Sequence, residues 1–432
     1  MRRKAEMIRK PKSQPYLSLG LDLPLSDMET LLFPKGYKLL PLVRQKYEFE
    51  LAAAESRALS PNELIKRGAY FMSIGGELTY HYLIAQAAPL QVSPDASETR
   101  KAFFDANRYS VAYATHGLFP YRGKFHPQMI KAIINIIGLK PQETLLDPMV
   151  GSGTTLVEAA LMGINSIGIE LNPFTVFMSK VKLEALDIET EYFSTLLQES
   201  DGVFKFFKEE RGYGSFVDIF DREPKLKNLA LLAYLDTLGY AVRRKTKTAQ
   251  ELYPGLLKRY LDAVEAFNKV RSKLNIRLGS WLVLTGDARN MPLDDASLDG
   301  IIFSPPYSFA LDYVENDRIQ LDYLGVEVEG LKQGMIGLRG EGRKTDVKEK
   351  VNYYFEDMDR VFKECARVLK KNRHCVVVIG SNTQQTGGVR LEKGLIELAK
   401  KNVLPLCHHM VREIEGIRNT MREEHILFFQ KA

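Results

Sequence analysis

Cysteine is scarce in this sequence, and long apolar runs are missing. The 432 residues include only three cysteines, Cys365, Cys375 and Cys407, and their spacing is not that of a zinc site. Three are also too few for a disulfide scaffold, so we expect a reducing, cytoplasmic location. Because no run of about 18 apolar residues occurs, we expect no membrane span. The basic N-terminus lacks the apolar stretch of a secretory signal.

Several catalytic signatures are missing as well. No Gly-Lys-Ser/Thr follows a glycine-rich turn, which excludes a P-loop. The H-x-E and P-C-x-x-C pair of the zinc-dependent base deaminases is also missing. The net charge of +6 is compatible with a polyanionic partner but does not demand one. A hydrophobic content of 45% and a charged content of 26% are ordinary for a globular protein.

The most informative stretch that is present is Ser304-Pro305-Pro306-Tyr307. It follows the apolar run Gly300–Phe303, which is typical of a buried parallel strand. Two prolines hold the backbone extended and stiff at the carboxyl end of that strand, where open α/β sheets place their chemistry. The turn offers a hydroxyl, a carbonyl and an aromatic face, which suit a planar heterocycle with an exocyclic amine. The simpler alternative is a proline-rich turn with a surface tyrosine.

A second informative stretch combines a strand, a glycine turn and a helix. The strand Thr144–Asp147 ends in an acid that can hold a cationic amine, and Gly151 and Gly153 let the backbone approach a ligand closely. Glu170, at the tip of the next strand, is placed to bind a ribose diol. Its distance from Gly151 is close to the roughly 20 residues of the dinucleotide-binding fingerprint, which keeps an NAD site open on these residues alone. The G-x-G-T-T run and the Asp-Pro count against that alternative.

Further apolar runs alternate with amphipathic helices and predict a doubly wound α/β sheet. The next strand in the sequence after the one that ends at Glu170 is followed by Asp287. The last two strands are expected to form an antiparallel pair. The predicted strands are 144–147, 166–171, 281–285, 300–303, 374–380, 403–414 and 424–430.

Taken in order, the glycine turn, Glu170, Asp287 and Ser-Pro-Pro-Tyr resemble the amino-methyltransferases of nucleic acids that use S-adenosylmethionine (SAM). Serine in the first position of the tetrapeptide is typical of the N4-cytosine members, and Asp or Asn of the N6-adenine members. The resemblance covers about His116–Asp187 and Gly279–Ala432. It implies a Rossmann-like class I SAM-methyltransferase fold with a seven-stranded sheet. Met149 stands where that family usually has Phe.

The resemblance also implies a role for each motif. Ser304, Pro305, Pro306 and Tyr307 would be catalytic, and Asp287 would bind the adenine amine. No metal is implied. The expected cofactor-binding residues are Phe125, His126, Pro127, Asp147, Pro148, Gly151, Ser152, Gly153, Thr154, Glu170, Leu171, Asn172, Asp287, Ala288 and Ser304.

We expect two regions and one interruption. Residues 1–115 would form an N-terminal accessory or substrate-binding region, with helices over 47–59 and 61–74. Residues 116–432 would form the methyltransferase domain. Residues 187–279 are a helical insertion, because a parallel crossover needs only a dozen or so residues. The basic run 243–247 within it is either a solvated helix end or a phosphate contact.

The expected reaction is methylation of the N4 amine of a flipped or unpaired cytosine in nucleic acid. No recognisable DNA-binding module occurs, and the motif order is not the one typical of restriction N4-cytosine enzymes, so structured RNA such as ribosomal RNA is slightly favoured over DNA. The alternatives are a DNA N4-cytosine or N6-adenine methyltransferase and a catalytically silent SAM-fold binding subunit. No cysteine follows a proline, which argues against carbon-5 methylation of cytosine. A glutamine-methylating family uses Asn-Pro-Pro-Tyr, which Ser304 disfavours. The oligomeric state stays open.

Overall fold

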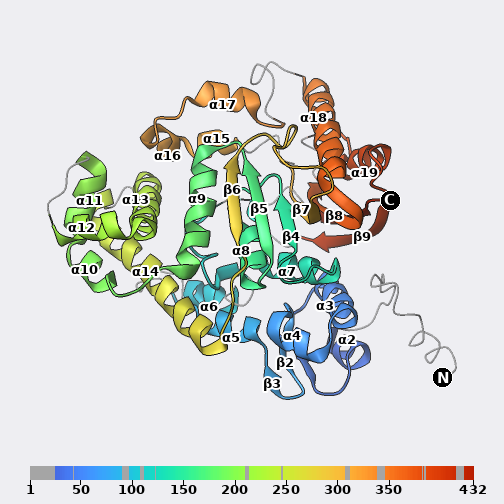
Figure 1. The fold of residues 1–432 in the computed structure, drawn as a ribbon, viewed down its shortest axis with the longest axis horizontal. Helices are drawn as coiled ribbons and strands as arrows, with labels where there is room; N and C mark the ends of the chain where they lie inside the picture. Colours follow the sequence, from blue (N-terminus) through green and yellow to red (C-terminus); the bar gives the residue numbers. More distant parts are fainter. Residues whose placement is uncertain are drawn as a thin grey trace.

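The central feature of the fold is a seven-stranded sheet with strand order β6-β5-β4-β7-β8-β10-β9 (Figure 1). The computed structural model describes residues 25–41, 43–89, 97–107, 111–121, 123–209, 214–244, 247–306, 312–337, 346–381, 383, 386–414 and 423–432. Only β10 runs antiparallel to its neighbours. The strands are β4 Thr144–Asp147, β5 Asn165–Glu170, β6 Trp281–Thr285, β7 Leu298–Phe303, β8 Leu369–Ser381, β9 Leu406–Glu413 and β10 Glu423–Gln430. The predicted α/β sheet and its antiparallel final pair are confirmed.

Helices cover both faces of this sheet, because successive side chains of a strand point to opposite faces. On β7, Ile302 packs into the core of α3 (Lys46–Ala58) and α7 (Pro127–Ile136). Its neighbour Ile301 packs into the core of α18 (Val347–Val368) and α19 (Leu391–Lys401). The central strands are therefore apolar on both sides, which is why their sequences are nearly continuous hydrophobic runs.

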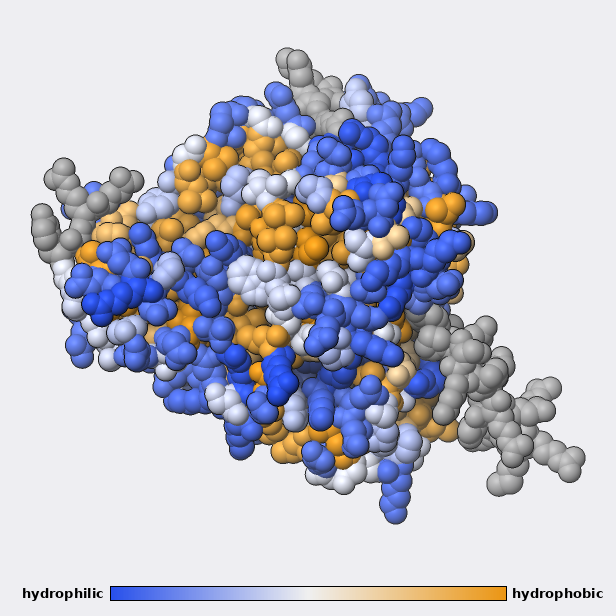
Figure 2. Space-filling view, in the orientation of Figure 1, coloured by the Kyte–Doolittle hydropathy of each residue, from blue (hydrophilic) through white to orange (hydrophobic). Residues whose placement is uncertain are grey.

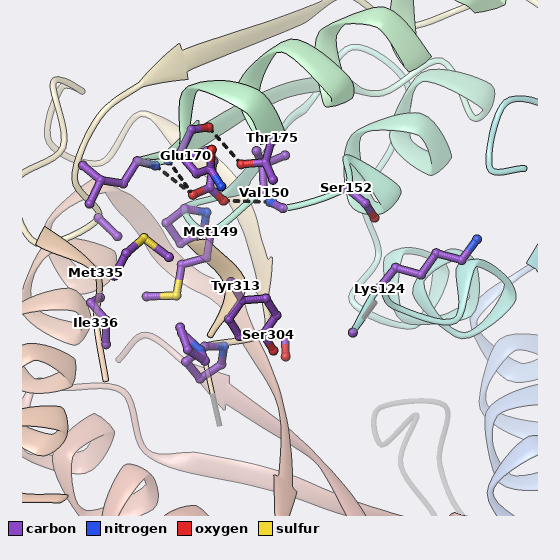
Figure 3. Close-up of a pocket in the computed structure, with 18 of the residues that line it drawn as sticks. Lys124, Met149, Val150, Ser152, Glu170, Thr175, Ser304, Tyr313, Met335 and Ile336 are labelled. Carbon is purple, nitrogen blue, oxygen red and sulfur yellow. Dashed lines mark hydrogen bonds between the residues drawn. The ribbon is translucent and has the colours of Figure 1, made fainter. Parts of the chain in front are cut away.

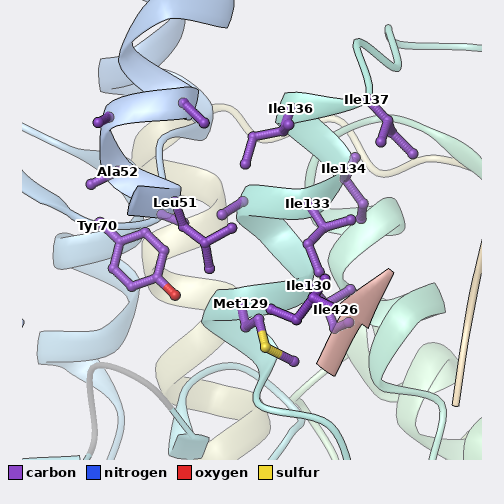
Figure 4. Packing of buried hydrophobic residues seen from close by; sticks show 14 of the residues in the cluster. Leu51, Ala52, Tyr70, Met129, Ile130, Ile133, Ile134, Ile136, Ile137 and Ile426 are labelled. Atoms are coloured by element: carbon purple, nitrogen blue, oxygen red, sulfur yellow. The ribbon is translucent and has the colours of Figure 1, made fainter. Parts of the chain in front are cut away.

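The N-terminal region shares its core with the sheet. Leu51, Ala52 and Tyr70 pack against the isoleucines of α7 (Figure 4). The elements of this region are α2 Leu25–Leu32, β1 Tyr37–Leu39, α3, α4 Pro61–Arg67, β2 Phe71–Ile74, β3 Glu77–Leu78, α5 Tyr80–Ala87 and α6 Glu98–Asn107. Strands β1, β2 and β3 form a separate small sheet.

One expected helix of this region is wrong in its second half. Residues 61–74 do not form a continuous helix, because α4 ends at Arg67 and β2 begins at Phe71. The Gly68 N–H donates to Leu64 O and closes the last turn. Gly68 is the C-cap of α4 and has an extended backbone conformation. A Cβ at this position would lie only 2.5 Å from Leu64 O. The helix expected at 47–59 is confirmed as α3.

The insertion forms a helical lobe beside α9 (Pro173–Glu184), shown on the left of Figure 1. Its helices are α10 Phe193–Gln198, α11 Ser200–Glu209, α12 Ser215–Arg222, α13 Pro224–Arg244 and α14 Ala249–Leu274, after a short 3-10 turn, η3 Ala185–Asp187. The basic side chains at 243–245 and the basic N-terminal tail lie outside the described residues.

The lobe holds the segment that follows β7. This segment contains α15 Tyr313–Asn316, α16 Arg318–Tyr323 and α17 Val328–Gly334. Gln320 Nε2 donates to Leu235 O at 3.1 Å, and Tyr323 Oη donates to Phe207 O at 2.9 Å. The insertion is therefore packed against the chain that comes directly after the Ser-Pro-Pro-Tyr turn.

The face of the molecule shown in Figure 2 has both hydrophobic and hydrophilic areas. Hydrophobic residues gather in the middle of the view and hydrophilic ones along most of the rim (Figure 2). In the part of the chain that the structure describes, no helix has the length and apolar character to cross a membrane.

Candidate cofactor and substrate site

The carboxyl ends of β4, β5, β6 and β7 meet at one pocket of about 950 Å³, its open mouth included. The predicted catalytic turn and the predicted cofactor turn lie in this same pocket. Of the predicted site residues, the pocket is lined by Phe125, Pro148, Gly151, Ser152, Thr154, Glu170, Leu171, Asn172, Asp287, Ala288, Ser304, Pro305 and Pro306. His126, Pro127, Asp147 and Gly153 are not on its wall, and Tyr307 lies outside the described residues.

The glycine turn has the backbone shape that its sequence indicates. Gly151 has φ +48° and Gly153 has φ +78°, in the left-handed region that favours glycine. Gly153 is the N-cap of α8 (Thr154–Leu161), and a Cβ there would lie 2.8 Å from Ser179 Cβ on α9. The turn therefore lies against α9, and Thr154, the first residue of α8, lines the pocket.

Glu170 is fixed in place by three backbone amides. Oε2 accepts from Gly151 N at 3.0 Å, and Oε1 accepts from Leu171 N at 2.9 Å and Asn172 N at 3.1 Å (Figure 3). Burial raises the pKa of Glu170, while these amides act in the opposite direction. A carboxylate has about four lone-pair sites, so one stays free to accept from a ribose hydroxyl.

Asp147 lies beneath the turn instead of on the pocket wall. Its side chain is buried, and Oδ1 accepts from Met149 N at 3.1 Å. Burial raises its pKa to about 7. The visible role of Asp147 is to shape the turn, and its contact with a cationic amine stays a prediction.

Asp287 lines the pocket but already holds a cation. Arg289 Nη2 donates to Asp287 Oδ2 at 2.7 Å, and Arg289 Nε donates to Oδ1 at 2.9 Å. The same guanidinium reaches Asp357 Oδ1 on α18 at 2.9 Å and Gly334 O at 2.7 Å. Arg289 thus ties the tip of β6 to α18 and to the segment carrying Met335 and Ile336. No local sequence pattern indicates this role, which depends on residues far apart in the chain.

The side chain of Asn172 is occupied by structural contacts. Oδ1 accepts from Phe174 N at 2.9 Å and caps α9, and Nδ2 donates to Asp317 Oδ2 at 3.0 Å. Burial raises the pKa of Asp317 to about 7. Asn172 therefore joins the tip of β5 to the start of α16.

Other pocket residues were missed in the sequence. Tyr121, Lys124, Tyr313, Met335 and Ile336 all line the pocket. Figure 3 shows Ser304 beside Tyr313, with Met335, Ile336 and Glu170 on one side and Ser152 and Lys124 on the other. Met335 and Ile336, which follow α17, belong to no recognisable motif. Their place in the pocket depends on how residues 312–334 fold.

These residues fit an adenosine-containing cofactor. Gly151 has no side chain, so a ligand can approach the backbone of the turn closely. The carboxylate of Glu170 is fixed and can accept hydrogen bonds from a diol. The apolar side chains of Met149, Met335 and Ile336 can cover a purine. The sheet order and the pocket at its carboxyl edge define a Rossmann-like class I methyltransferase fold.

Family comparisons agree with this class. Residues 118–205 match the RMKL-like methyltransferase domain, and residues 298–431 match the DNA methylase family. Over residues 298–431 the chain is DNA-methylase-like, and this family implies SAM as the cofactor.

Curated relatives cover parts of the chain. The Type II methyltransferase M.MjaII of Methanocaldococcus jannaschii is 37% identical over 107 residues, which are 25% of this chain and 20% of that protein. M.BsoBI of Geobacillus stearothermophilus, also a Type II methyltransferase, is 24% identical over 318 residues, or 57% of this chain and 62% of that protein. The tRNA (guanine(10)-N2)-dimethyltransferase of Methanothermobacter thermautotrophicus is 35% identical over 73 residues, or 17% of this chain and 22% of that protein. The chain thus spans less than two thirds of the length of each of these three relatives.

Proposed function

We propose that this protein uses SAM to methylate the exocyclic amine of a base in nucleic acid, and that the target atom is N4 of cytosine. One observation carries the proposal: Ser304 and Pro305 line the same pocket as Gly151 and Glu170. A methyl donor held by the glycine turn and a base held by the Ser-Pro-Pro turn would therefore share one cavity.

The pocket residues have distinct tasks in this proposal. SAM supplies an electrophilic methyl group on a sulfonium. The Gly151 turn and Glu170 hold the adenosine part. The target amine donates one N–H to Ser304 Oγ and one to Pro305 O, which turns its lone pair toward the methyl group. The amine attacks the methyl carbon directly, without a covalent enzyme intermediate. The N–C bond forms as the S–C bond breaks, S-adenosylhomocysteine leaves, and the proton of the amine goes to water. Tyr307 is assigned to stacking on the base.

Ser304 supports cytosine over adenine, since Asp or Asn at this position is typical of the N6-adenine enzymes it resembles. We assign substrate recognition to the insertion lobe and to α15–α17, which pack together beside the pocket. The N-terminal region shares the core of α7 and is proposed to be an accessory part of the same domain.

For the polymer, the matched family model supports DNA. Structured RNA is the second candidate, because the sequence shows no DNA-binding module and a tRNA-modifying enzyme is similar over 73 residues. Both candidates need the base out of a helix to reach the pocket.

Mass spectrometry of nucleosides from cells with and without the gene tests the proposal. DNA and RNA are digested separately, and N4-methylcytosine is expected to disappear from one of them when the gene is lost. The gene carrying Ser304→Ala serves as the matched control; its product is expected to bind SAM normally but not to restore the modification. Loss of N6-methyladenine alone would show that the target atom is wrong. No change in any methylated base would overturn the function.

A further inference from the structure

The hydroxyl of Tyr313 is a hydrogen-bond donor that the protein itself leaves unused. The Tyr313 ring lines the pocket, and Figure 3 shows it beside Ser304. In the described part of the chain, Tyr313 Oη has no hydrogen-bond partner, whereas Tyr260 Oη donates to Asp236 Oδ2 at 3.1 Å. Burial raises the pKa of Tyr313, so the hydroxyl keeps its proton at neutral pH. A protonated hydroxyl without a protein acceptor can donate to a ligand.

The short helix α15, which carries Tyr313, is held at both of its ends. At its start, Asp312 Oδ1 accepts from Glu315 N at 2.9 Å, and Lys332 Nζ on α17 lies 3.4 Å from Asp312 Oδ2. At its end, Asp317 N donates to Tyr313 O at 3.2 Å. The ring is therefore presented to the pocket by a fixed element, which is what a residue that orients a ligand requires.

The phenol end of Tyr313 packs closely against Gly123. A Cβ at Gly123 would lie 3.2 Å from Tyr313 Oη and 3.5 Å from Tyr313 Cε1. Gly123 has φ +74°, in the left-handed region that favours glycine. Both residues line the pocket, so the missing side chain at Gly123 leaves room for the hydroxyl at the wall of the cavity.

The base that carries the target amine needs such a donor. In cytosine, the amine N4 is attached beside the ring nitrogen N3, which accepts hydrogen bonds. In the proposed function, Ser304 Oγ and Pro305 O both act as acceptors for the amine. A base that has left its helix has also lost its pairing partner, so N3 would stay unsatisfied in the pocket, which is unfavourable for a buried acceptor. The site therefore requires one donor beside its two acceptors, and Tyr313 lies beside Ser304.

We propose that Tyr313 Oη donates a hydrogen bond to the ring nitrogen next to the target amine, N3 if the base is cytosine, and thereby orients the base for methyl transfer. Two acceptors then match the amine, and one donor matches the ring nitrogen. A contact of this kind acts on turnover, because the amine must point at the methyl group to react. This inference rests on the proposed function, since it assumes that a base enters the pocket beside Ser304.

The turnover of Tyr313→Phe tests this contact, since the change removes only the hydroxyl. DNA and RNA from cells that lack the gene are tested separately as substrates, with tritiated SAM as the methyl donor. kcat is expected to fall about 10- to 100-fold, the value of a hydrogen bond left unmade. KM for the nucleic acid and the calorimetric affinity for S-adenosylhomocysteine are expected to stay within about 3-fold. Tyr353→Phe is the matched control, because that hydroxyl donates to Glu349 at the surface, and it is expected to change none of the three values. Thermal unfolding verifies that both variants fold.

A base analogue identifies the atom that Tyr313 contacts. The tritium label locates the methylated sequence, and an oligonucleotide of that sequence then carries either cytosine or 3-deazacytosine, which has C–H in place of N3, at the target position. If the target is adenine, 1-deazaadenine takes this place. The analogue alters the amine for both proteins, so the quantity compared is the ratio of kcat/KM between the wild type and Tyr313→Phe. This ratio is expected to be about 10 to 100 on the natural base and within about 3-fold of one on the analogue.

The outcomes separate the inference from the function. Unchanged kcat in Tyr313→Phe, or the same loss on the natural base and the analogue, would overturn the contact with the ring nitrogen. A higher KM alone would assign the hydroxyl to the nucleic-acid backbone, and weaker binding of S-adenosylhomocysteine would assign it to the cofactor. Either result would also overturn the inference while leaving methyl transfer by the wild type intact. If the wild type transfers no methyl group to either nucleic acid, the proposed function itself fails.

Discussion

Asn172 donates its side-chain amide to Asp317 at 3.0 Å, and this contact joins the two sides of the pocket. Asn172 is the N-cap of α9 at the tip of β5, whereas Asp317 is the N-cap of α16, after the Ser-Pro-Pro turn. Both side chains are buried. This hydrogen bond therefore links the tip of β5 to the start of α16, two places far apart in the sequence.

Asn172→Ala is expected to destabilise the protein more than it weakens cofactor binding. Loss of the α9 cap costs about 1 kcal/mol, and loss of the donor to a buried carboxylate costs about 1–3 kcal/mol. The peptide N–H of residue 172 still donates to Glu170, so SAM affinity is expected to fall only a few-fold. Urea unfolding and calorimetry measure the two effects. A large loss of affinity with unchanged stability would instead place the Asn172 side chain on the cofactor.

Arg289 belongs to none of the predicted motifs, but its loss is expected to lower the affinity for the cofactor. Arg289→Met removes a cation shared by Asp287 and Asp357, and removing one partner of a buried ion pair costs about 3–5 kcal/mol. It also frees Gly334 O, so Met335 and Ile336 lose their anchor at the pocket.

Arg289→Lys keeps the charge but lacks the guanidinium fork, so an intermediate loss of SAM affinity is expected. Calorimetry of both variants at 25 °C measures it, with urea unfolding as the control for folding. Wild-type affinity in Arg289→Met would show that the segment after α17 does not depend on this contact.

The strands and the two pocket turns could be predicted because their signals are local. Apolar runs end at Pro305 or before Gly151, and each signal falls within a few residues. The directions of side chains could not be predicted in the same way. Asn172 follows Glu170 in the sequence, yet its amide turns to Asp317 instead of into the pocket. The charge of Lys124 also acts on the buried Lys182 of α9, and no sequence pattern indicates that interaction.

The helix expected over 61–74 shows the same limit. An apolar periodicity continues through Tyr70 and Phe71, but Gly68 ends the helix and the next residues join a strand pair. That choice depends on β1, which pairs with β2 from residues before α3. Local propensity is a weak guide where a partner strand lies elsewhere in the chain.

Glu55 is expected to make the stability of the protein fall as the pH rises. It is fully buried, accepts from Ala69 N at 2.9 Å, and burial raises its pKa to about 7. An unfolded glutamate has a pKa of about 4.3, so the folded state binds the proton more tightly. The stabilisation is complete below about pH 4.3 and is lost as the pH rises through about 7.

Glu55→Gln removes this titration and is expected to flatten the curve. Between about pH 4.3 and 7, the wild type should lose on the order of 1–3 kcal/mol more unfolding free energy than the variant. Urea unfolding at pH 5, 6, 7 and 8 measures the difference. Asp147 and Asp317 also titrate near 7, but they are present in both proteins and cancel. Parallel curves for the two proteins would contradict the assignment.

Gly153→Ala is expected to damage the cofactor turn through two separable effects. Its φ of +78° costs an alanine about 1–2 kcal/mol, and its Cβ would lie 2.8 Å from Ser179 Cβ. Gly75 supplies the matched control, since it has φ +61° but nothing within 4 Å of an added Cβ. Gly75→Ala should therefore show the backbone cost alone, with unchanged SAM affinity.

The clash itself can be tested by a double variant. Ser179→Gly removes the opposing Cβ, so in the Gly153→Ala background it should recover part of both stability and SAM affinity. In the wild-type background the same change only weakens α9, by about 1 kcal/mol. The non-additivity of the two changes measures the close approach of the turn to α9. If Gly153→Ala and Gly75→Ala cost the same, or if Ser179→Gly gives no recovery, the turn does not need the space that Gly153 leaves for α9.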